Sequence, residues 1–140
     1  CVGSIMKEKI QQYLSTKWPA IIWSVFVFIL LVLPPEALNK ERKIEIVQLD
    51  KIIHFFLFGI LAGLWAYYKK QQRQKQLFPF LFIVAVTAVY GIATEFVQDW
   101  VGRDFDVWDM VADAAGALVF VCWVWYKKED PGRNRGRNQN

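Results

Sequence analysis

Cysteine and histidine are scarce in this sequence, whose 140 residues include two cysteines and one histidine. Cys122 lies inside an apolar run and forms no disulfide framework with Cys1. No cysteine or serine stands in a pattern that marks a nucleophile. A histidine with several carboxylates can hold a divalent cation, but the spacing around His54 matches no dedicated metal motif. The sequence therefore predicts no cofactor and no bound metal.

A cleavage site of small residues is also missing after the first apolar run, where Pro34, Pro35 and Glu36 stand instead. This absence argues against a cleaved signal peptide. Because no methionine precedes Cys1, Met6 is an alternative first residue.

Charge is almost absent from four apolar runs of about 16 to 20 residues, near the length of helix that crosses a hydrocarbon core. These runs are residues 18–33, 52–68, 77–93 and 107–126. Backbone polar groups at that depth need internal partners, so each run is expected to be a helix. The sequence predicts an all-α polytopic membrane protein with a bundle of four transmembrane helices over residues 18–126. An N-terminal segment, residues 1–17, precedes the bundle, and a basic tail, residues 127–140, follows it.

The seventeen lysines and arginines are distributed unevenly between the segments that flank these runs. Twelve lie in the N-terminal segment, the second loop and the tail, whereas five lie in the first and third loops. By the positive-inside rule, both termini are cytoplasmic, and the first and third loops face the outside of the plasma membrane. The Gly, Asn and Arg content of the tail favours disorder and contact with anionic membrane lipids, not with nucleic acid.

Polar residues gather where the second and third predicted helices reach the outer side. Asp50, Lys51 and His54 are spaced three and four residues apart, so they share one helical face. Two interpretations of His54 stay open: a packed, hydrogen-bonded residue, or a proton carrier or ligand, because histidine titrates near neutral pH. Glu95 and Gln98 give the third helix a polar face as it leaves the membrane.

The fourth predicted helix begins with acids. Asp106, or Asp104 before it, can cap this helix, and Asp109 suits the positive end of the helix dipole. Asp113 lies roughly 10 Å into the helix, where an acid must be protonated, paired or facing water, so we expect a functional role for it. Arg103 in the preceding loop can bridge the carboxylates in a static ion network, or it can bind an anionic group such as a phosphate.

The topology brings these polar faces to one level at the outer surface, which predicts a ligand-binding site there. Its expected members are Asp50, Lys51, His54, Glu95, Gln98, Arg103, Asp106, Asp109 and Asp113.

An ordered set of short patterns carries a family resemblance. The patterns are Leu33-Pro34, Asp50-Lys51-x-x-His54, Tyr90-Gly91-x-x-x-Glu95-x-x-Gln98, Arg103-x-x-Asp106-x-x-Asp109 and a small-residue run to Gly116. Over residues 18–126 the chain resembles the VanZ-like family of small bacterial membrane proteins. The resemblance implies a multi-helix integral membrane protein, and the family's namesake is associated with low-level resistance to the glycopeptide teicoplanin. Asp113 stands where the family usually has an asparagine.

Three functions fit these observations. The first is a protein of the bacterial cell envelope whose outer site binds a ligand or lipid headgroup, such as a lipid-linked envelope precursor or a glycopeptide, and influences teicoplanin susceptibility. The second is a membrane enzyme acting on a lipid-linked or phosphorylated envelope substrate, with Glu95 or His54 as acid or base and Arg103 on the anionic group. The third is a structural membrane protein whose charges hold its helices together.

Overall fold

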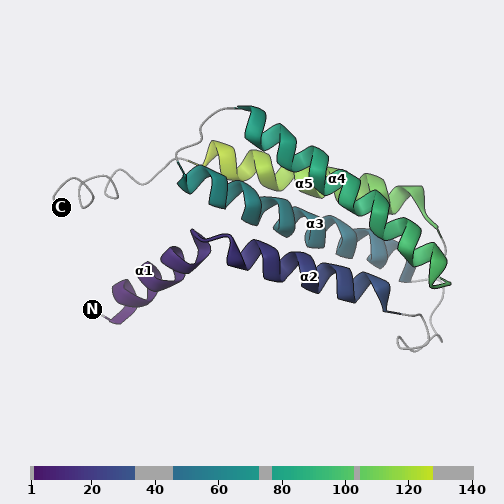
Figure 1. Cartoon of the computed structure of the whole chain (residues 1–140), viewed down its shortest axis with the longest axis horizontal. Helices are drawn as coiled ribbons and strands as arrows, with labels where there is room; N and C mark the ends of the chain where they lie inside the picture. Colours follow the sequence, from purple (N-terminus) through teal and green to yellow (C-terminus); the bar gives the residue numbers. More distant parts are fainter. Residues whose placement is uncertain (1, 34–45, 73–76, 103–104, 128–140) are drawn as a thin grey trace.

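A computed structural model describes residues 2–33, 46–72, 77–102 and 105–127, and all regular structure in these ranges is α-helical. The helices are, in chain order, α1 (Val2–Leu14), α2 (Trp18–Val32), α3 (Ile46–Gln71), α4 (Leu77–Trp100) and α5 (Val107–Tyr126). In Figure 1, α2, α3, α4 and α5 run along one long axis, and α1 turns away before the start of α2. The fold class is therefore all-α, as the sequence predicts.

The centre of the bundle is α3, which packs against α2, α4 and α5. Its most extensive contact is with α5, and α4 covers both of these helices. Figure 1 shows that α3 and α5 begin at the same end of the bundle, which is the end where α2 and α4 finish. This arrangement brings four helix termini from distant parts of the sequence to one place.

The helix bounds agree with the predicted apolar runs at some ends and differ at others. The fourth run coincides with α5. The first run is one residue longer than α2, because Leu33 is already extended at φ −60° and ψ 128°, the conformation preferred before proline. The second and third predicted runs are shorter than the helices that contain them, since α3 begins at Ile46 and α4 continues to Trp100. The added turns carry polar residues out of the apolar layer.

Helices α3, α4 and α5 are long and apolar enough to cross a membrane, over Leu49–Gln71, Leu77–Trp100 and Val107–Tyr126. With 15 residues, α2 spans only about 22 Å of a hydrocarbon layer that is roughly 30 Å thick. α2 is long enough for a fourth span only if it is counted together with Ile5–Leu14 of α1, and the chain bends by 65° between the two helices. The described part of the chain thus has three candidate spans, or four if the bent pair is one span.

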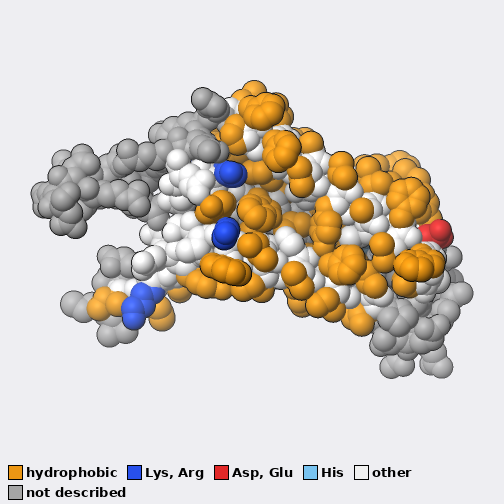
Figure 2. Space-filling model, in the orientation of Figure 1, with side chains coloured by type: hydrophobic (Ala, Val, Ile, Leu, Met, Phe, Trp, Pro, Cys, Tyr) orange, Lys and Arg blue, Asp and Glu red, His pale blue; other side chains and the backbone are white. Residues whose placement is uncertain are grey.

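Apolar side chains cover the outside of these helices. Phe82 and Val89 of α4 are exposed, as are Leu118 and Trp123 of α5. In Figure 2 the charged side chains of the visible face lie at the two ends of the molecule, with lysine or arginine toward the termini and an acid at the opposite end. Such a surface fits lipid around the middle and water at the ends.

A glycine sets the close approach of α3 and α5. A side chain on Gly116 would collide with the backbone carbonyl oxygen of Phe55, and backbone cannot move aside as a flexible side chain can. Gly63 of α3 is less constrained, because an added Cβ would lie 3.5 Å from the Phe120 side chain, an ordinary contact distance. The two helices therefore pack backbone to backbone at Gly116, in the manner of small-residue contacts between membrane helices.

Candidate functional site

Polar residues from three helices gather at the end of the bundle where α3 and α5 begin. We call this group the polar cluster. It consists of Asp50, Lys51 and His54 of α3, Glu95 and Gln98 of α4, and Asp106, Asp109 and Asp113 at the start of α5. The ninth predicted site residue, Arg103, lies outside the described residues.

His54 and Asp113 form a buried pair between α3 and α5. The distance between His54 Nδ1 and Asp113 Oδ1 is 2.9 Å, and the two side chains are 0% and 1% exposed. The imidazole stacks on the ring of Phe58. A side chain on Gly91 of α4 would come 2.5 Å from Asp113 Oδ2, so the glycine provides the space that Asp113 occupies. The deepest acid of α5 is therefore paired with the histidine inside the protein.

Glu95 joins the end of α4 to the start of α5. Its Oε1 accepts a hydrogen bond from the backbone N–H of Asp106 at 2.6 Å, and the residue is 1% exposed. Asp106 is the N-cap residue of α5, where its side chain accepts from the N–H of Trp108 at 2.9 Å. In a capping box, a glutamate of the same helix accepts from the N-cap N–H. Here a neighbouring helix supplies that glutamate.

Lys51 pairs with two acids of α5. Its Nζ lies 2.5 Å from Asp106 Oδ2 and 3.3 Å from Asp109 Oδ1. Lys51 and Asp106 are partly exposed, at 29% and 31%, whereas the Asp109 side chain is 7% exposed. The hydrogen bond from Lys51 holds the pKa of Asp106 below its usual range, and the bond from Trp108 acts in the same direction. Lys51 thus bridges two carboxylates of α5. The bridge that the sequence predicts for Arg103 lies outside the described residues.

Gln98 ties α4 to the end of α2. Its Nε2 donates to the carbonyl oxygen of Leu31 at 3.2 Å, and the residue is 2% exposed. Leu31 lies in the last turn of α2. Nearer the middle of the bundle, the hydroxyl of Tyr90 donates to the carbonyl oxygen of Ser24 at 2.8 Å. Both contacts fix α2 against α4.

Three buried atoms of the polar cluster have no hydrogen-bond partner in the residues that the structure describes. They are His54 Nε2, Glu95 Oε2 and Asp113 Oδ2. A carboxylate oxygen is an acceptor, and a histidine that donates from Nδ1 to Asp113 keeps a lone pair on Nε2. All three atoms can therefore accept a hydrogen bond or contact a cation. A buried polar atom without a partner costs about 1–3 kcal/mol.

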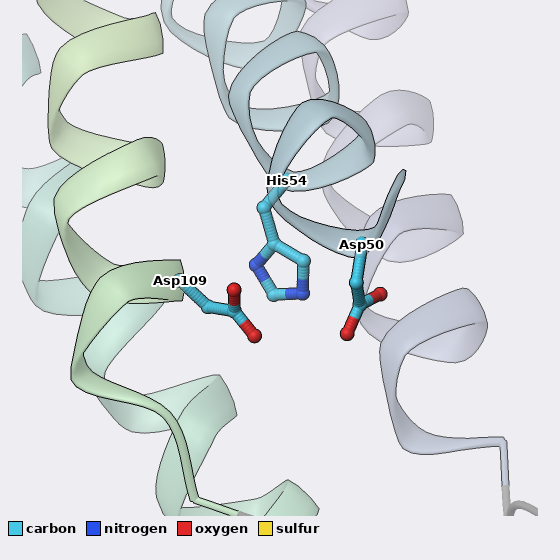
Figure 3. Close-up of side chains that lie close together, drawn as sticks. All are labelled: Asp50, His54 and Asp109. Atoms are coloured by element: carbon cyan, nitrogen blue, oxygen red, sulfur yellow. The ribbon is translucent and has the colours of Figure 1, made fainter. Parts of the chain in front are cut away.

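Asp50, His54 and Asp109 are the members that could hold a metal ion. One ligand atom from each lies within 4.8 Å of the other two. Figure 3 shows the imidazole of His54 between the two carboxylates, with Asp50 and His54 on one helix and Asp109 on another. The sequence offers only the Asp-x-x-x-His spacing as a signal, because the third residue comes from another helix. The expectation of no metal site rests on motif spacing alone.

An apolar pocket lies apart from this group, between α2, α3 and α4. It has a volume of about 380 Å³, and its lining includes Ser24, Leu61, Trp65, Val86 and Tyr90. The sequence gives no sign of it, because its lining residues have the same apolar character as the packed faces of the helices.

Comparisons with known proteins found one family and one curated relative to report. The family model described as VanZ/LLP1 matches residues 5–127. A protein of Schizosaccharomyces pombe described as uncharacterized is 30% identical over an alignment of 107 residues, which covers 73% of this chain and 63% of that protein. The chain thus spans less than two thirds of the length of this relative. No solved structure matches the chain.

Proposed function

The chain belongs to the VanZ/LLP1 family, and we propose that it is a membrane protein of the cell envelope. Its polar cluster binds a lipid headgroup, or a ligand of similar chemistry, at the outer surface of the plasma membrane. The family match confirms the resemblance inferred from the sequence. The observation that carries the proposal is the set of buried acceptor atoms at one end of the bundle, on His54, Glu95 and Asp113.

The distribution of charge supports an outward-facing polar cluster. Lys69 and Lys70 end α3 at the opposite end of the bundle, and Lys127 follows α5 there. The positive-inside rule assigns such an end to the cytoplasm. The polar cluster would then lie at the outer leaflet, where a headgroup could reach it from the lipid.

The chemistry of the polar cluster favours a ligand with hydrogen-bond donors. Among its described members are five carboxylates and one lysine, so acceptors greatly outnumber donors. Asp50, Lys51 and Asp106 are only partly buried, so a headgroup can contact them. An ammonium headgroup offers donors to the carboxylates, and its phosphate can contact Lys51. The expected ligand is therefore a headgroup with a primary ammonium group.

A static network is the competing explanation. Contacts of Lys51, Glu95 and Gln98 do join the helices, as a purely structural role requires. Among the residues that the structure describes, such a role leaves His54 Nε2 and Glu95 Oε2 buried without a partner, at about 1–3 kcal/mol each. A ligand would remove that cost, whereas the described contacts between the helices do not.

A comparison of phosphatidylethanolamine and phosphatidylcholine binding distinguishes these explanations, because the headgroup of phosphatidylcholine has no N–H donors. We expect native mass spectrometry of the purified full chain to show about tenfold preferred binding of phosphatidylethanolamine, equivalent to about 1.4 kcal/mol. Glu95→Gln keeps an acceptor for the Asp106 N–H but loses the carboxylate charge, so it should reduce the preference. Asp99→Asn, an exposed acid on the same helix, is the matched control.

The proposal fails if the wild-type chain binds the two lipids equally. It also fails if Glu95→Gln and Asp99→Asn keep the same preference while both remain folded. Either result would leave the network as a structural device.

Glycopeptide susceptibility is a second readout, suggested by the association of the family's namesake with teicoplanin resistance. We expect expression of the full chain in a glycopeptide-susceptible bacterium to raise the inhibitory concentration of teicoplanin. Glu95→Gln should lose this effect and Asp99→Asn should keep it. An unchanged inhibitory concentration with the wild-type chain would remove glycopeptides from the proposal.

A further inference from the structure

We propose that Asp50, His54 and Asp109 form a binding site for a divalent cation, and that Zn²⁺ is the ion that fits this set of ligands. One ligand atom from each residue lies within 4.8 Å of the other two. His54 is 0% exposed, and its Nε2 has no partner in the described part of the chain. Figure 3 shows this ring between the carboxylates of Asp50 and Asp109. A cation placed between the three would use the free lone pair.

Asp113 prepares His54 for this role. Its Oδ1 lies 2.9 Å from His54 Nδ1, and both side chains are buried. Histidines that bind metals usually donate their other ring N–H to a carboxylate or a carbonyl, which fixes the tautomer and the orientation of the ring. In this arrangement Nδ1 carries the proton and Nε2 is left to bind the ion. Asp113 is therefore a positioning residue for the metal ligand.

The distances require side-chain movements on the order of an ångström. Zinc binds histidine nitrogen and carboxylate oxygen at about 2.0–2.2 Å, so two ligand atoms of a tetrahedral site lie about 3.3–3.6 Å apart. The present separations are up to 4.8 Å, so the carboxylates of Asp50 and Asp109 must move toward the ion. Asp109 contacts Lys51 through Oδ1, but a carboxylate has two oxygens and can keep that contact while it binds an ion.

The mixed ligand set favours Zn²⁺. Imidazole suits zinc and the later transition metals, whereas carboxylates alone suit Mg²⁺, Ca²⁺ and Mn²⁺. Three protein ligands leave the fourth position of a tetrahedral zinc ion open. A water or a headgroup oxygen could occupy it. The inference rests on the proposed function only for that fourth ligand, because the protein ligands do not depend on a lipid.

The charge of the polar cluster also favours a cation. Its described residues include five carboxylates and one lysine. Carboxylates in an apolar setting must be protonated, paired or bound to a metal. A divalent cation would offset two of these charges where three helices meet.

The single histidine makes a direct test practical. The full chain, purified without a histidine tag, labelled with ¹⁵N-histidine and stripped with a chelator, gives one pair of imidazole nitrogen signals in NMR. On addition of Zn²⁺, we expect one ion per chain, a Kd of about 1 µM or tighter, a shifted Nε2 signal and a protonated Nδ1. A binding isotherm by calorimetry gives the affinity of each variant.

Two variants and one control decide the assignment. Asp50→Asn and Asp109→Asn should each weaken Zn²⁺ binding at least about tenfold, whereas Asp99→Asn should bind as the wild type does. Using two variants protects the test if one of them does not fold. The site is disproved if the Nε2 signal does not move at saturating Zn²⁺, or if every folded ligand variant binds as tightly as the control.

The cation site and the proposed function can fail separately. Zn²⁺ binding is measured without a phosphatidylethanolamine comparison, and lipid preference is measured on chelator-treated protein. A retained lipid preference without Zn²⁺ binding would overturn the cation site alone. Zn²⁺ binding without a lipid preference would overturn the headgroup proposal alone.

Discussion

The Oε1 atom of Glu95 in α4 accepts a hydrogen bond from the backbone N–H of Asp106, the N-cap residue of α5, at 2.6 Å. The N–H groups at a helix start have no partner within the helix, so this bond satisfies one of them from a neighbouring helix. The side chain of Asp106 pairs with Lys51 of α3. A single N-cap residue thus connects α3, α4 and α5.

Removal of the Glu95 acceptor should destabilise the bundle. We expect Glu95→Ala to lower the free energy of unfolding by about 1–3 kcal/mol, because the Asp106 N–H loses its buried partner. Glu95→Gln should lose less, since an amide oxygen can still accept that bond. Thermal unfolding of both variants in detergent, followed by circular dichroism, measures the difference. Equal stability of Glu95→Ala and the wild type would show that the bond contributes nothing.

Two glycines of the α3–α5 interface should respond oppositely to alanine. Gly116→Ala places a Cβ against the carbonyl oxygen of Phe55, so we expect a loss of about 1–3 kcal/mol from overpacking. Gly63→Ala meets the Phe120 side chain only at 3.5 Å, so the gain in helix propensity of about 1 kcal/mol should dominate. Thermal unfolding of the two variants side by side checks the prediction. Similar effects at both positions would argue against a close backbone contact at Gly116.

The Lys51–Asp106 pair should make stability depend on acid pH. The folded-state pKa of Asp106 is lowered chiefly by its hydrogen bond from Lys51. The contribution of the Lys51–Asp106 pair to the free energy of unfolding is therefore fully present above the unfolded-state pKa of about 3.9. It is lost as the pH falls through the folded-state pKa of Asp106. Asp106→Asn keeps the N-cap acceptor but removes the charge.

Thermal unfolding of wild type and Asp106→Asn between about pH 3 and pH 6 tests this dependence. The wild type should be more stable near pH 6, and the difference should shrink toward zero below about pH 4. If the stability difference between the wild type and Asp106→Asn stays constant across this range, Lys51 does not lower the pKa of Asp106.

Lys70 of α3 caps the C-terminal end of α5. Its Nζ donates to the carbonyl oxygens of Val124 at 2.6 Å and Trp125 at 3.2 Å. These groups lie in the last turn of the helix and have no N–H partner within it. We expect Lys70→Met to lower the unfolding free energy by about 1.5–3 kcal/mol, typical for hydrogen bonds from a charged donor.

Lys69→Met is the matched control for Lys70→Met. The ammonium of Lys69 lies 6.0 Å from the centre of the Tyr68 ring, a contact worth about 0.5–1 kcal/mol at an exposed site. The midpoint of thermal unfolding should fall further for Lys70→Met than for Lys69→Met. The reverse order would contradict the capping role.

Much of the architecture follows from the sequence because it depends on local patterns. The apolar run at 107–126 coincides with α5, and Asp106 caps it as its position before the run predicts. The sequence does not predict α1 in residues 1–17, since that segment is short and carries several charges. The sequence also does not predict the start of α3 at Ile46, because Gln48, Asp50 and Lys51 interrupt the apolar residues before the run begins.

The pairing inside the polar cluster is harder to predict. Spacing shows that Asp106, Asp109 and Asp113 share a face of one helix, but not which residue of another helix each will meet. The pair of Lys51 with Asp106 and that of His54 with Asp113 depend on how α3 and α5 are aligned along their length. That alignment depends on the close contact of Gly116 with the backbone of Phe55. The glycine predicts close packing, but its partner is known only from the three-dimensional structure.

Cysteine labelling tests most directly on which side of the membrane the polar cluster lies. Asp99, near the end of α4, and Gln72, directly after α3, are exposed. The ends of α3 and α4 lie at opposite ends of the bundle (Figure 1). Each is replaced by cysteine in a full chain whose own cysteines are serine, and intact cells are treated with a membrane-impermeant thiol reagent. If the polar cluster faces outward, Asp99→Cys is labelled in intact cells and Gln72→Cys only after permeabilisation. Labelling of Gln72→Cys alone in intact cells would place the polar cluster on the cytoplasmic side and overturn the proposed outer site.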